Sequence, residues 1–310
     1  MTDPTPVLLD CDPGHDDAIA LLLALASPEL ELLGVTTVAG NQTLEKTTAN
    51  ALRVLEFVGR GDVPVAAGTD RPLARELFIA AYVHGESGLD GPALPEPLGA
   101  PVDQHAVDFL AERILGSARP VTLVLVGPLT NIALLLSRYP EAADNIGRLV
   151  IMGGALAEGN VTPAAEFNIY VDPEAAWRVF HSGLPVTMIG LDVTHKALMK
   201  DAHAQRLRES GPTGRMVAEL YDFFIEYHRR TYEHDGAPIH DAVAVAQVLR
   251  PGIVETLHRH VDIDCESRLC RGRTVVDLWR RTANEPNTDV GVDIDADGFL
   301  ELLCGRISSL

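Results

Sequence analysis

Residues 7–26, VLLDCDPGHDDAIALLLALA, place a short apolar run before a turn and a strong helix-forming segment. The run at 7–9 shows no alternation of polar and apolar side chains, which is typical of a strand buried on both faces of a parallel sheet. Pro13 and Gly14 break the strand, and an aspartate after them is well placed as the helix N-cap. A strand that leads directly into a helix favours an α/β fold.

Four aspartates gather at this turn, because Asp10, Asp12, Asp16 and Asp17 lie within eight positions. In open α/β sheets, ligands bind at the carboxyl ends of the strands. A helix N-terminus stabilises one or two acidic side chains, but four carboxylates this close repel one another, and burial forces some of them to take a proton. A bound cation relieves this repulsion most simply, and all-oxygen ligands favour calcium or magnesium over zinc or copper.

Composition narrows the class of protein. With 310 residues, 46% of them hydrophobic, the chain can bury a large core. A formal net charge of −19 argues against nucleic acid or an anionic membrane as a partner. The four cysteines lack metal-site spacing, so we expect free thiols in a reducing compartment. We find no N-terminal leader pattern and no apolar stretch long enough to span a bilayer, and we therefore expect a soluble cytoplasmic protein.

Apolar and amphipathic segments alternate along the rest of the chain, with no linker or internal repeat. Strands are expected around 32–41, 63–70, 121–126, 148–155 and 184–195 and in the tail from 274. Helices are expected around 44–60, 106–118, 130–139 and 214–236 and from 240. Residues 84–101 form a long loop rich in Gly and Pro, which is more often functional than idle. The sequence predicts one α/β domain over residues 1–310, with a mainly parallel central sheet flanked by helices.

Polar side chains or turns follow most of the expected strands. These positions are Asp12, Asn41, Val126–Gly127, Met152–Gly153 and Asp192. If the strands are parallel neighbours, all of these positions share one crevice at the edge of the sheet.

The segment DCDPGHDDAIALLLA resembles the signature of the inosine–uridine nucleoside hydrolase family. Five further segments occur in the family's order and approximate spacing: VHGESGLDG (83–91), VGPLTNIA (126–133), MGGA (152–155), GNVTPAAEFNIYVDPEAA (159–176) and HDAVAV (240–245). The resemblance covers nearly the whole chain. It implies the nucleoside hydrolase fold with a Rossmann-like core, and hydrolysis of the N-glycosidic bond of purine or pyrimidine ribonucleosides to ribose and free base.

The resemblance also implies a tightly bound Ca²⁺ that grips the 2′- and 3′-hydroxyls of the ribose. Its ligands would be the carboxylates of Asp12, Asp17 and Asp241 and the backbone carbonyl of Val126. Asp10 would then orient the loop without touching the ion. Such a cation would neutralise much of the aspartate cluster, and its oxygen ligands match the usual coordination of calcium.

Catalytic roles follow from the same resemblance. Asp12 would act as general base toward a water that calcium also binds and acidifies. His240 would protonate the departing base, because imidazole titrates near neutrality and this residue precedes the expected ligand Asp241. His84, in the Gly-rich loop, is a second candidate, either as the acid or as part of a proton relay. His195 is a weaker candidate, since lone histidines are more often surface or core residues.

A set of polar side chains would hydrogen-bond the ribose hydroxyls: Asp16, Asn41, Glu166 and Asn168, with Asn160 near the 5′-hydroxyl. Met152 would line the pocket. Phe167, between Glu166 and Asn168, belongs to the same substrate-binding segment. If this segment is extended, the two-residue spacing puts Glu166 and Asn168 on one face, and Phe167 points elsewhere.

The chain departs from the family pattern in two places. Many members carry proline after the His-Asp pair, where this chain has Ala242. Residues 221–234 fall where the family has a mobile lid that varies between members and covers the base. Phe224, His228 and Tyr232 are candidate lid residues that stack on or bond the base, although packing of a helix face into the core explains Phe224 equally well. Base preference, purine or pyrimidine, is left open.

Three other functions compete with this interpretation. A D-x-D after a buried strand also opens the phosphotransferases that form an aspartyl-phosphate with magnesium, but the chain has only three lysines and its PGHDD continuation does not suit them. The chain could be a calcium-dependent binder of ribosyl ligands that lacks activity. It could also hydrolyse a modified nucleoside or another N-riboside. By analogy with the family, we expect a homodimer or a homotetramer.

Overall fold

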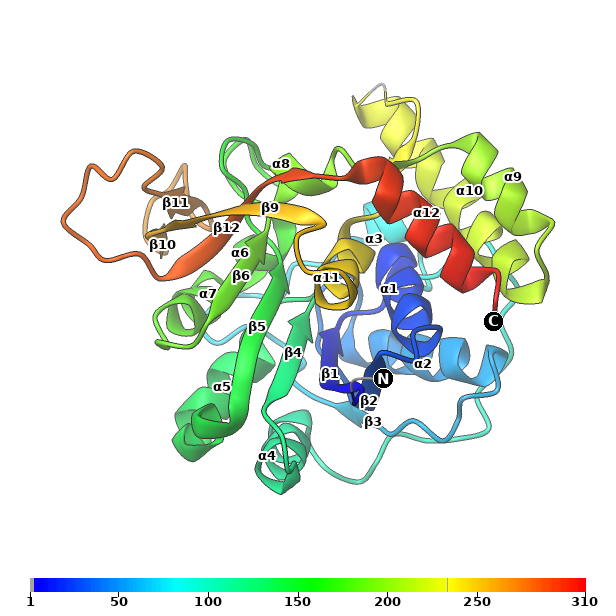
Figure 1. Cartoon of the computed structure of the whole chain (residues 1–310), viewed down its shortest axis with the longest axis horizontal. Helices are drawn as coiled ribbons and strands as arrows, with labels where there is room; N and C mark the ends of the chain where they lie inside the picture. The colour runs from blue at the N-terminus through cyan, green and yellow to red at the C-terminus, as the bar shows by residue number, and fades with distance from the viewer. Residues whose placement is uncertain (1–2, 233) are drawn as a thin grey trace.

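The computed structural model describes residues 3–232 and 234–310. Its centre is an eight-stranded sheet with strand order β3-β2-β1-β4-β5-β6-β12-β9 (Figure 1). Neighbouring strands run parallel except β12 and β9, which confirms the mainly parallel sheet. The strands are β1 Thr5–Cys11, β2 Leu30–Thr37, β3 Val65–Ala67, β4 Val121–Leu125, β5 Ile146–Met152, β6 Val186–Ile189, β9 Val254–Arg259 and β12 Thr288–Ile294.

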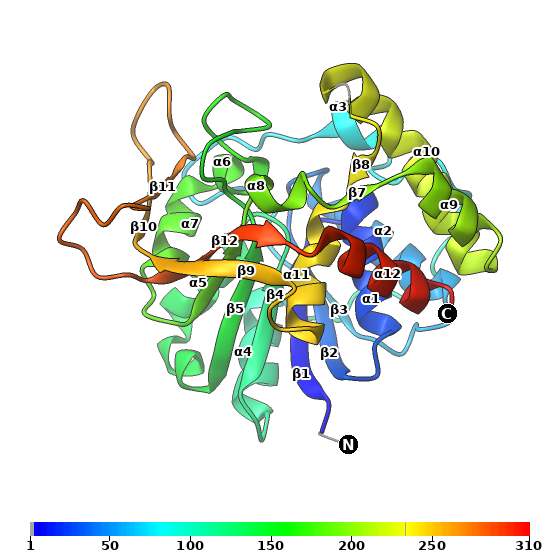
Figure 2. The ribbon, with the colours of Figure 1, turned by 45° about the horizontal axis from the view of Figure 1, so that its top comes forward.

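Helices cover both faces of the sheet (Figures 1 and 2). In chain order they are α1 His15–Leu25, α2 Leu44–Phe57, α3 Ala81–His84, α4 Ala106–Gly116, α5 Thr130–Arg138, the 3₁₀ turn η1 Pro140–Asn145, α6 Phe167–Val171, α7 Pro173–Phe180, α8 Leu191–Thr194, α9 Asp201–Arg208, α10 Pro212–Tyr232, α11 His240–Leu249 and α12 Ala296–Ile307. Two short antiparallel pairs lie outside the sheet: β7 Leu198–Met199 with β8 Ala237–Pro238, and β10 Val261–Ile263 with β11 Thr274–Val276.

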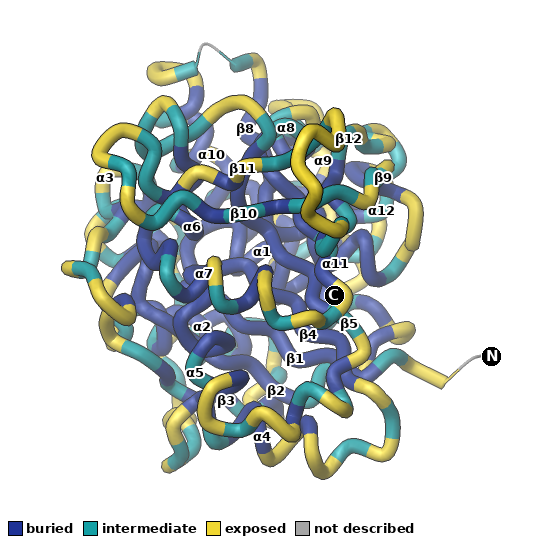
Figure 3. Tube along the Cα trace, turned by 90° about the vertical axis from the view of Figure 1, so that its left-hand side faces the viewer, coloured by how far each residue is buried: buried dark blue, intermediate teal, exposed yellow. Residues whose placement is uncertain are grey.

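The central strands are buried on both faces. In β1, Val7 and Leu9 pack into the apolar layer formed with α1, α2, α10, α11 and α12, whereas Leu8 packs into the layer formed with α4, α5 and α7. Figure 3 shows β1 and β4 in the buried interior, with the exposed residues toward the outside of the molecule. Because successive side chains point to opposite faces, burial of both faces explains why the sequence shows no polar alternation here.

Strand order creates a switch point between β1 and β4. From β1 the chain runs outward through β2 to β3, and it returns to β4 on the other side of β1. The helices after β1 and β4 therefore diverge at the carboxyl end of the sheet and leave a crevice between them, which is where ligands bind in such folds. Asp12 follows β1 at this crevice and Val126 follows β4, with Val126 N–H donating to the Asp10 carbonyl at 2.9 Å.

Several expected strands are shorter in the structure, and two of these differences bear on the site. The strand expected over 184–195 ends at Ile189, and α8 begins at Leu191, because Gly190 adopts an extended conformation as the N-cap of that helix. The strand expected over 32–41 ends at Thr37, so Asn41 lies in the turn after it. Among the described residues, no helix combines the length and the apolar character that crossing a membrane requires.

Candidate active site

A pocket opens at the carboxyl edge of the sheet, where ligands bind in such folds. Every side chain that the sequence predicted to bind substrate lines it: Asp16, Asn41, His84, Met152, Asn160, Glu166, Phe167 and Asn168. Val126, Asp241, His240 and the three candidate lid residues line it as well. Asp192 is not part of the lining; its Oδ2 accepts a hydrogen bond from the Leu156 backbone at 2.5 Å.

Four acidic side chains form the floor of the pocket. Asp12 and Asp17 are buried beneath the lining, and carboxylate oxygens of Asp16, Asp17 and Asp241 lie within 4.8 Å of one another. Asp12 is outside that triplet, but its carboxyl group contacts that of Asp17. The geometry therefore groups Asp16 with the expected ligands more closely than the sequence suggested.

One oxygen of Asp12 is left without a partner. Its Oδ2 accepts the Asn41 backbone N–H at 2.6 Å, whereas the buried Oδ1 has no hydrogen-bond partner among the described residues. A Cβ at Gly40 would lie 2.1 Å from Oδ2, and one at Gly127 would lie 2.7 Å from Oδ1, so only glycine fits at either position. A buried carboxylate oxygen without a donor is costly unless a proton or a cation compensates it.

Burial governs the electrostatics of the floor. It raises the pKa of Asp16 to about 8 and holds those of Asp12 and Asp241 well above the usual range, with neighbouring carboxylates adding to the shift. The pKa of Asp17 is also raised by burial. A hard divalent cation with oxygen ligands would supply the missing positive charge, so the donor set fits a metal site.

Asp10 lies behind this cluster. Its Oδ1 accepts hydrogen bonds from Thr36 Oγ1 at 2.5 Å and from Asn131 Nδ2 at 2.8 Å, and burial raises its pKa to about 7. It connects the end of β1 to β2 and α5, as expected for a residue that orients the loop.

Amide side chains on one wall have fixed orientations. Asn41 Nδ2 donates to Asp17 Oδ2 at 3.0 Å. Asn168 Nδ2 donates to the carbonyls of Val126 at 3.0 Å and Met152 at 3.1 Å. Both amides therefore use their N–H groups inside the protein, and their Oδ1 atoms are left to accept hydrogen bonds from hydroxyls.

The segment at 166–168 is not extended, so the condition for a strand-like alternation is not met. Glu166 is the N-cap of α6, where its carboxylate accepts the N–H groups of Asn168 and Ile169. Helical geometry replaces the alternation of a strand, so Phe167 lines the pocket beside Glu166 and Asn168 instead of pointing elsewhere. Asn160 Oδ1 accepts the Phe167 N–H at 2.9 Å, which holds the preceding loop against the helix.

Histidines and aromatic rings form the opposite wall. His240 Nδ1 lies 2.7 Å from Thr194 Oγ1, and burial lowers the pKa of His240 well below its usual range. Phe224 and His228 are both buried on α10, with ring centroids 4.4 Å apart. Phe224 also stacks on His84, so α10 closes directly over the Gly-rich loop.

His84 is held by a second buried histidine. His15 Nε2 lies 2.8 Å from the Asp90 carbonyl and therefore carries a proton, which makes Nδ1 of the neutral His15 ring an acceptor. His84 Nδ1 lies 3.1 Å from this atom and 3.3 Å from the His15 backbone nitrogen, whose N–H donates to it. Burial lowers the pKa of both rings.

Sequence reasoning missed three ring-bearing residues of the lining. Tyr82 and Tyr227 were not considered, and His195 was rated a weak candidate, yet all three line the pocket. Tyr82 lies on α3 and Tyr227 on α10, with ring centroids 6.1 Å apart. His195 Nδ1 lies 2.7 Å from Glu158 Oε1, and its ring lies 5.5 Å from that of His240. No local pattern in the sequence brings these segments together.

Comparisons with known proteins agree with this geometry. The inosine-uridine preferring nucleoside hydrolase family matches residues 7–301. A pyrimidine-specific ribonucleoside hydrolase, RihA, of Salmonella paratyphi B is 56% identical over 97% of this chain and 98% of its own length. RihA of an Escherichia coli strain is 55% identical over the same shares.

Solved structures extend the agreement to the fold. A purine-preferring ribonucleoside hydrolase from Gardnerella vaginalis superimposes with a TM-score of 0.93, at 36% identity, over 98% of both chains. The plant nucleoside hydrolase PpNRh1 gives a TM-score of 0.92, at 34% identity, over 99% of this chain and all of its own. The chain therefore belongs to the inosine-uridine preferring nucleoside hydrolase family and is a hydrolase of the N-glycosidic bond of ribonucleosides.

Proposed function

We propose that this enzyme hydrolyses pyrimidine ribonucleosides and that it does so with one Ca²⁺ per chain. The main support for the metal is Oδ1 of Asp12, which is buried and has no hydrogen-bond partner among the described residues. This oxygen belongs to the cluster of carboxylates at the floor of the pocket. The pyrimidine preference is supported by 56% identity, over nearly the whole chain, to relatives named pyrimidine-specific, against 36% to the purine-preferring enzyme.

The proposed ligands are the carboxylates of Asp12, Asp17 and Asp241 and the carbonyl oxygen of Val126. Asp16 lies close to Asp17 and Asp241, so a cation bound by them would also offset the charge of Asp16. Asp16 itself would contact the sugar. Calcium at this position would supply positive charge that orients the ribose diol and lowers the pKa of a nearby water. Asn168 already fixes the Val126 carbonyl from one side, at 3.0 Å.

Asp12 has the position of a general base. Oδ2 is anchored by the Asn41 backbone, so Oδ1 is the oxygen that can accept a proton from the attacking water. As the N-glycosidic bond breaks, positive charge develops on the ribosyl ring, as in other glycoside hydrolysis. The carboxylates of the floor stabilise that charge, and the preset Oδ1 atoms of Asn41 and Asn168 hold the hydroxyls. We assign Glu166 and Asn160 to the remaining sugar hydroxyls.

His240 is the proposed acid toward the departing base. Burial keeps the free ring neutral, but negative charge that develops on the base favours a proton on the adjacent imidazole. His84, held against His15, is the second candidate near the base, as the acid or as part of a proton relay. Phe224, His228 and Tyr232 would pack against the base from α10, with Met152 and Phe167 completing the apolar lining.

His240→Ala is expected to lower kcat for uridine by about 10²- to 10⁴-fold, the usual worth of a general acid, and to leave an activated nitrophenyl riboside nearly unaffected. The nitrophenyl leaving group departs without a proton, whereas uracil is a poor leaving group and needs the acid. Steady-state kinetics on both substrates measures the difference. His105→Ala, which removes the N-cap side chain of α4 outside the pocket, is the matched control. Equal losses on both substrates would refute the acid role.

The proposed substrate class is tested by release of reducing sugar from uridine, cytidine, inosine, adenosine and guanosine with calcium present. We expect kcat/KM for uridine or cytidine to exceed that for every purine nucleoside by at least about tenfold, the scale on which a pocket discriminates by shape. Higher values for a purine nucleoside would contradict the preference. No release from any of the five would favour a modified nucleoside, or a binder without activity.

We further propose a cytoplasmic enzyme that assembles as a homodimer or homotetramer. The cytoplasmic location is supported by Cys11 and Cys304, which are buried free thiols. Free thiols are typical of a reducing compartment. Light scattering of the purified protein measures the assembly, and a monomer at micromolar concentration would contradict it.

A further inference from the structure

A second group of metal-ligating side chains lies away from the pocket. His181 follows the end of α7, His260 lies between β9 and β10, and Asp262 belongs to β10. A ring nitrogen of each histidine and a carboxylate oxygen of Asp262 lie within 4.8 Å of one another. None of the three lines the pocket, and in Figure 1 the β10–β11 ribbon lies on the opposite side of the molecule from α10.

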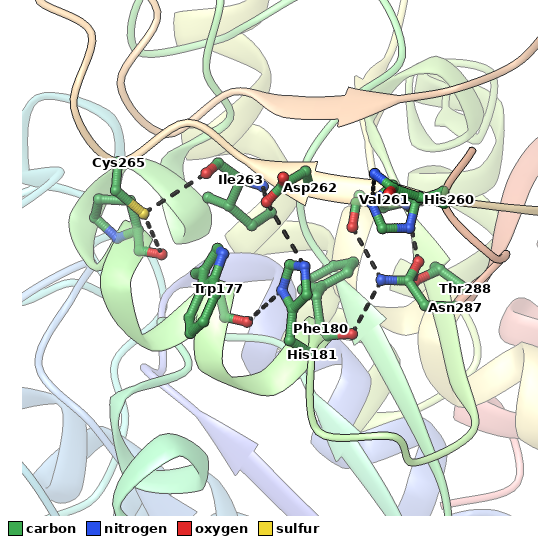
Figure 4. A network of polar contacts seen from close by, with 12 residues as sticks. Trp177, Phe180, His181, His260, Val261, Asp262, Ile263, Cys265, Asn287 and Thr288 are labelled. Atoms are coloured by element: carbon green, nitrogen blue, oxygen red, sulfur yellow. Dashed lines mark hydrogen bonds and ion pairs between the residues drawn. The ribbon is translucent and has the colours of Figure 1, made fainter. Parts of the chain in front are cut away.

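Hydrogen bonds fix the protonation of His181. Its Nδ1 lies 2.9 Å from the Trp177 carbonyl, which can only accept, so Nδ1 carries the proton of the neutral ring. Nε2 then holds a lone pair, and it faces Asp262 Oδ1 at 3.7 Å (Figure 4). Two acceptors that face each other at this distance can share a water, a proton or a cation.

His260 has the same arrangement. Its Nδ1 lies 3.0 Å from the Glu285 carbonyl, and its Nε2 lies 3.2 Å from Asn284 Nδ2, which can only donate. Both contacts require the proton on Nδ1 and a lone pair on Nε2. A metal-binding histidine almost always donates its other ring N–H to a carbonyl or carboxylate, which fixes the tautomer and the ring. Both histidines of this group show that feature with backbone carbonyls.

We propose that His181, His260 and Asp262 bind a divalent transition ion, best represented by Zn²⁺. Two imidazoles and one carboxylate suit zinc, whereas calcium and magnesium prefer oxygen ligands only. At ligand distances of about 2.0–2.2 Å, tetrahedral ligand atoms lie about 3.4 Å apart. These partly exposed side chains, whose ligand atoms lie within 4.8 Å of one another, would therefore close by up to about 1.4 Å. The amide of Asn284 would give way to the ion, and water would complete the coordination.

Occupancy of this site would connect α7 to the β10–β11 ribbon. The two elements are otherwise joined here by Asn287, whose Nδ2 donates to the carbonyls of Phe180 and Val261. A metal bound only by the folded arrangement stabilises it by mass action, so zinc should raise the unfolding temperature without entering the pocket. The inference does not depend on the substrate proposed above.

The test is a calorimetric titration of zinc into calcium-saturated protein, which keeps the acidic floor occupied. Wild type is expected to bind one zinc per chain and to unfold at higher temperature with zinc. His181→Ala and His260→Ala should each weaken this binding at least about tenfold and remove the thermal shift. His258→Ala is the matched control, because His258 is exposed on β9 and pairs with Asp289 at 2.9 Å outside the group.

Fluorescence supplies a second readout. The Trp177 ring stacks on His181, with centroids 4.7 Å apart, so Cu²⁺ at the same site should quench Trp177 in wild type and His258→Ala but not in His181→Ala. Wild-type protein that binds no zinc would overturn the inference. Zinc uptake that persists unchanged in either His181→Ala or His260→Ala would overturn it as well.

Discussion

Asp12→Asn is expected to lower kcat for nucleoside hydrolysis by about 10³-fold or more, because it removes the proposed general base and a proposed metal ligand together. Asparagine keeps the size of the side chain, and its Oδ1 can still accept the Asn41 N–H. Its NH₂ group then takes the place of the unpartnered oxygen and directs two protons toward the position of the cation. Steady-state kinetics with saturating calcium measures the loss.

Asp192→Asn is the matched control for this change. Asp192 also follows a strand of the sheet, but it contacts the backbone of Leu156 outside the pocket. Its variant should keep kcat within a factor of a few. Near-normal kcat for Asp12→Asn would remove Asp12 both as base and as ligand, whereas a similar loss in both variants would show a general effect on folding.

Removal of calcium is expected to make stability depend steeply on pH. In the metal-free protein, burial raises the pKa of Asp16 to about 8 and holds those of Asp12 and Asp241 well above the value of about 3.9 that aspartate has in an unfolded chain. Between these values the folded state binds more protons than the unfolded state. The free energy of unfolding therefore falls as pH rises from about 4 to 8, by up to about 1.4 kcal/mol per pH unit for each such group.

With calcium bound, the carboxylates are ionised in both states, so this dependence should largely disappear. Urea unfolding at pH 5, 6.5 and 8, with and without calcium, measures both curves. The expected result is a stabilisation by calcium that grows with pH. Metal-free protein that is equally stable at pH 5 and pH 8 would contradict the account of the acidic floor.

Much of the fold and of the sugar side of the site could be predicted from the sequence, because both depend on local patterns. The run at 7–9 and the turn at Pro13 and Gly14 predict a buried strand followed by a helix, and the structure has β1 and α1 there. Strand order then brings Asp12 and Val126 together, since parallel strands end at the same edge.

Sequence reasoning fell short at one local helix cap and where tertiary packing joins distant segments. Spacing alone suggested a strand-like alternation at 166–168, but the carboxylate of Glu166 caps the backbone of α6 and turns Phe167 toward the pocket. Tyr82 and Tyr227 were missed on the base side, because α3 carries the one and α10 the other, and these helices are far apart in the sequence. Only the packing of α10 over the Gly-rich loop makes them neighbours.

The central claim is that the buried carboxylates at the switch point hold one calcium ion on which hydrolysis depends. Stripped of metal and then titrated with calcium, the protein should release ribose from uridine in proportion to the calcium bound, with full activity at one ion per chain. Metal-free protein that hydrolyses uridine at the full rate would contradict the claim.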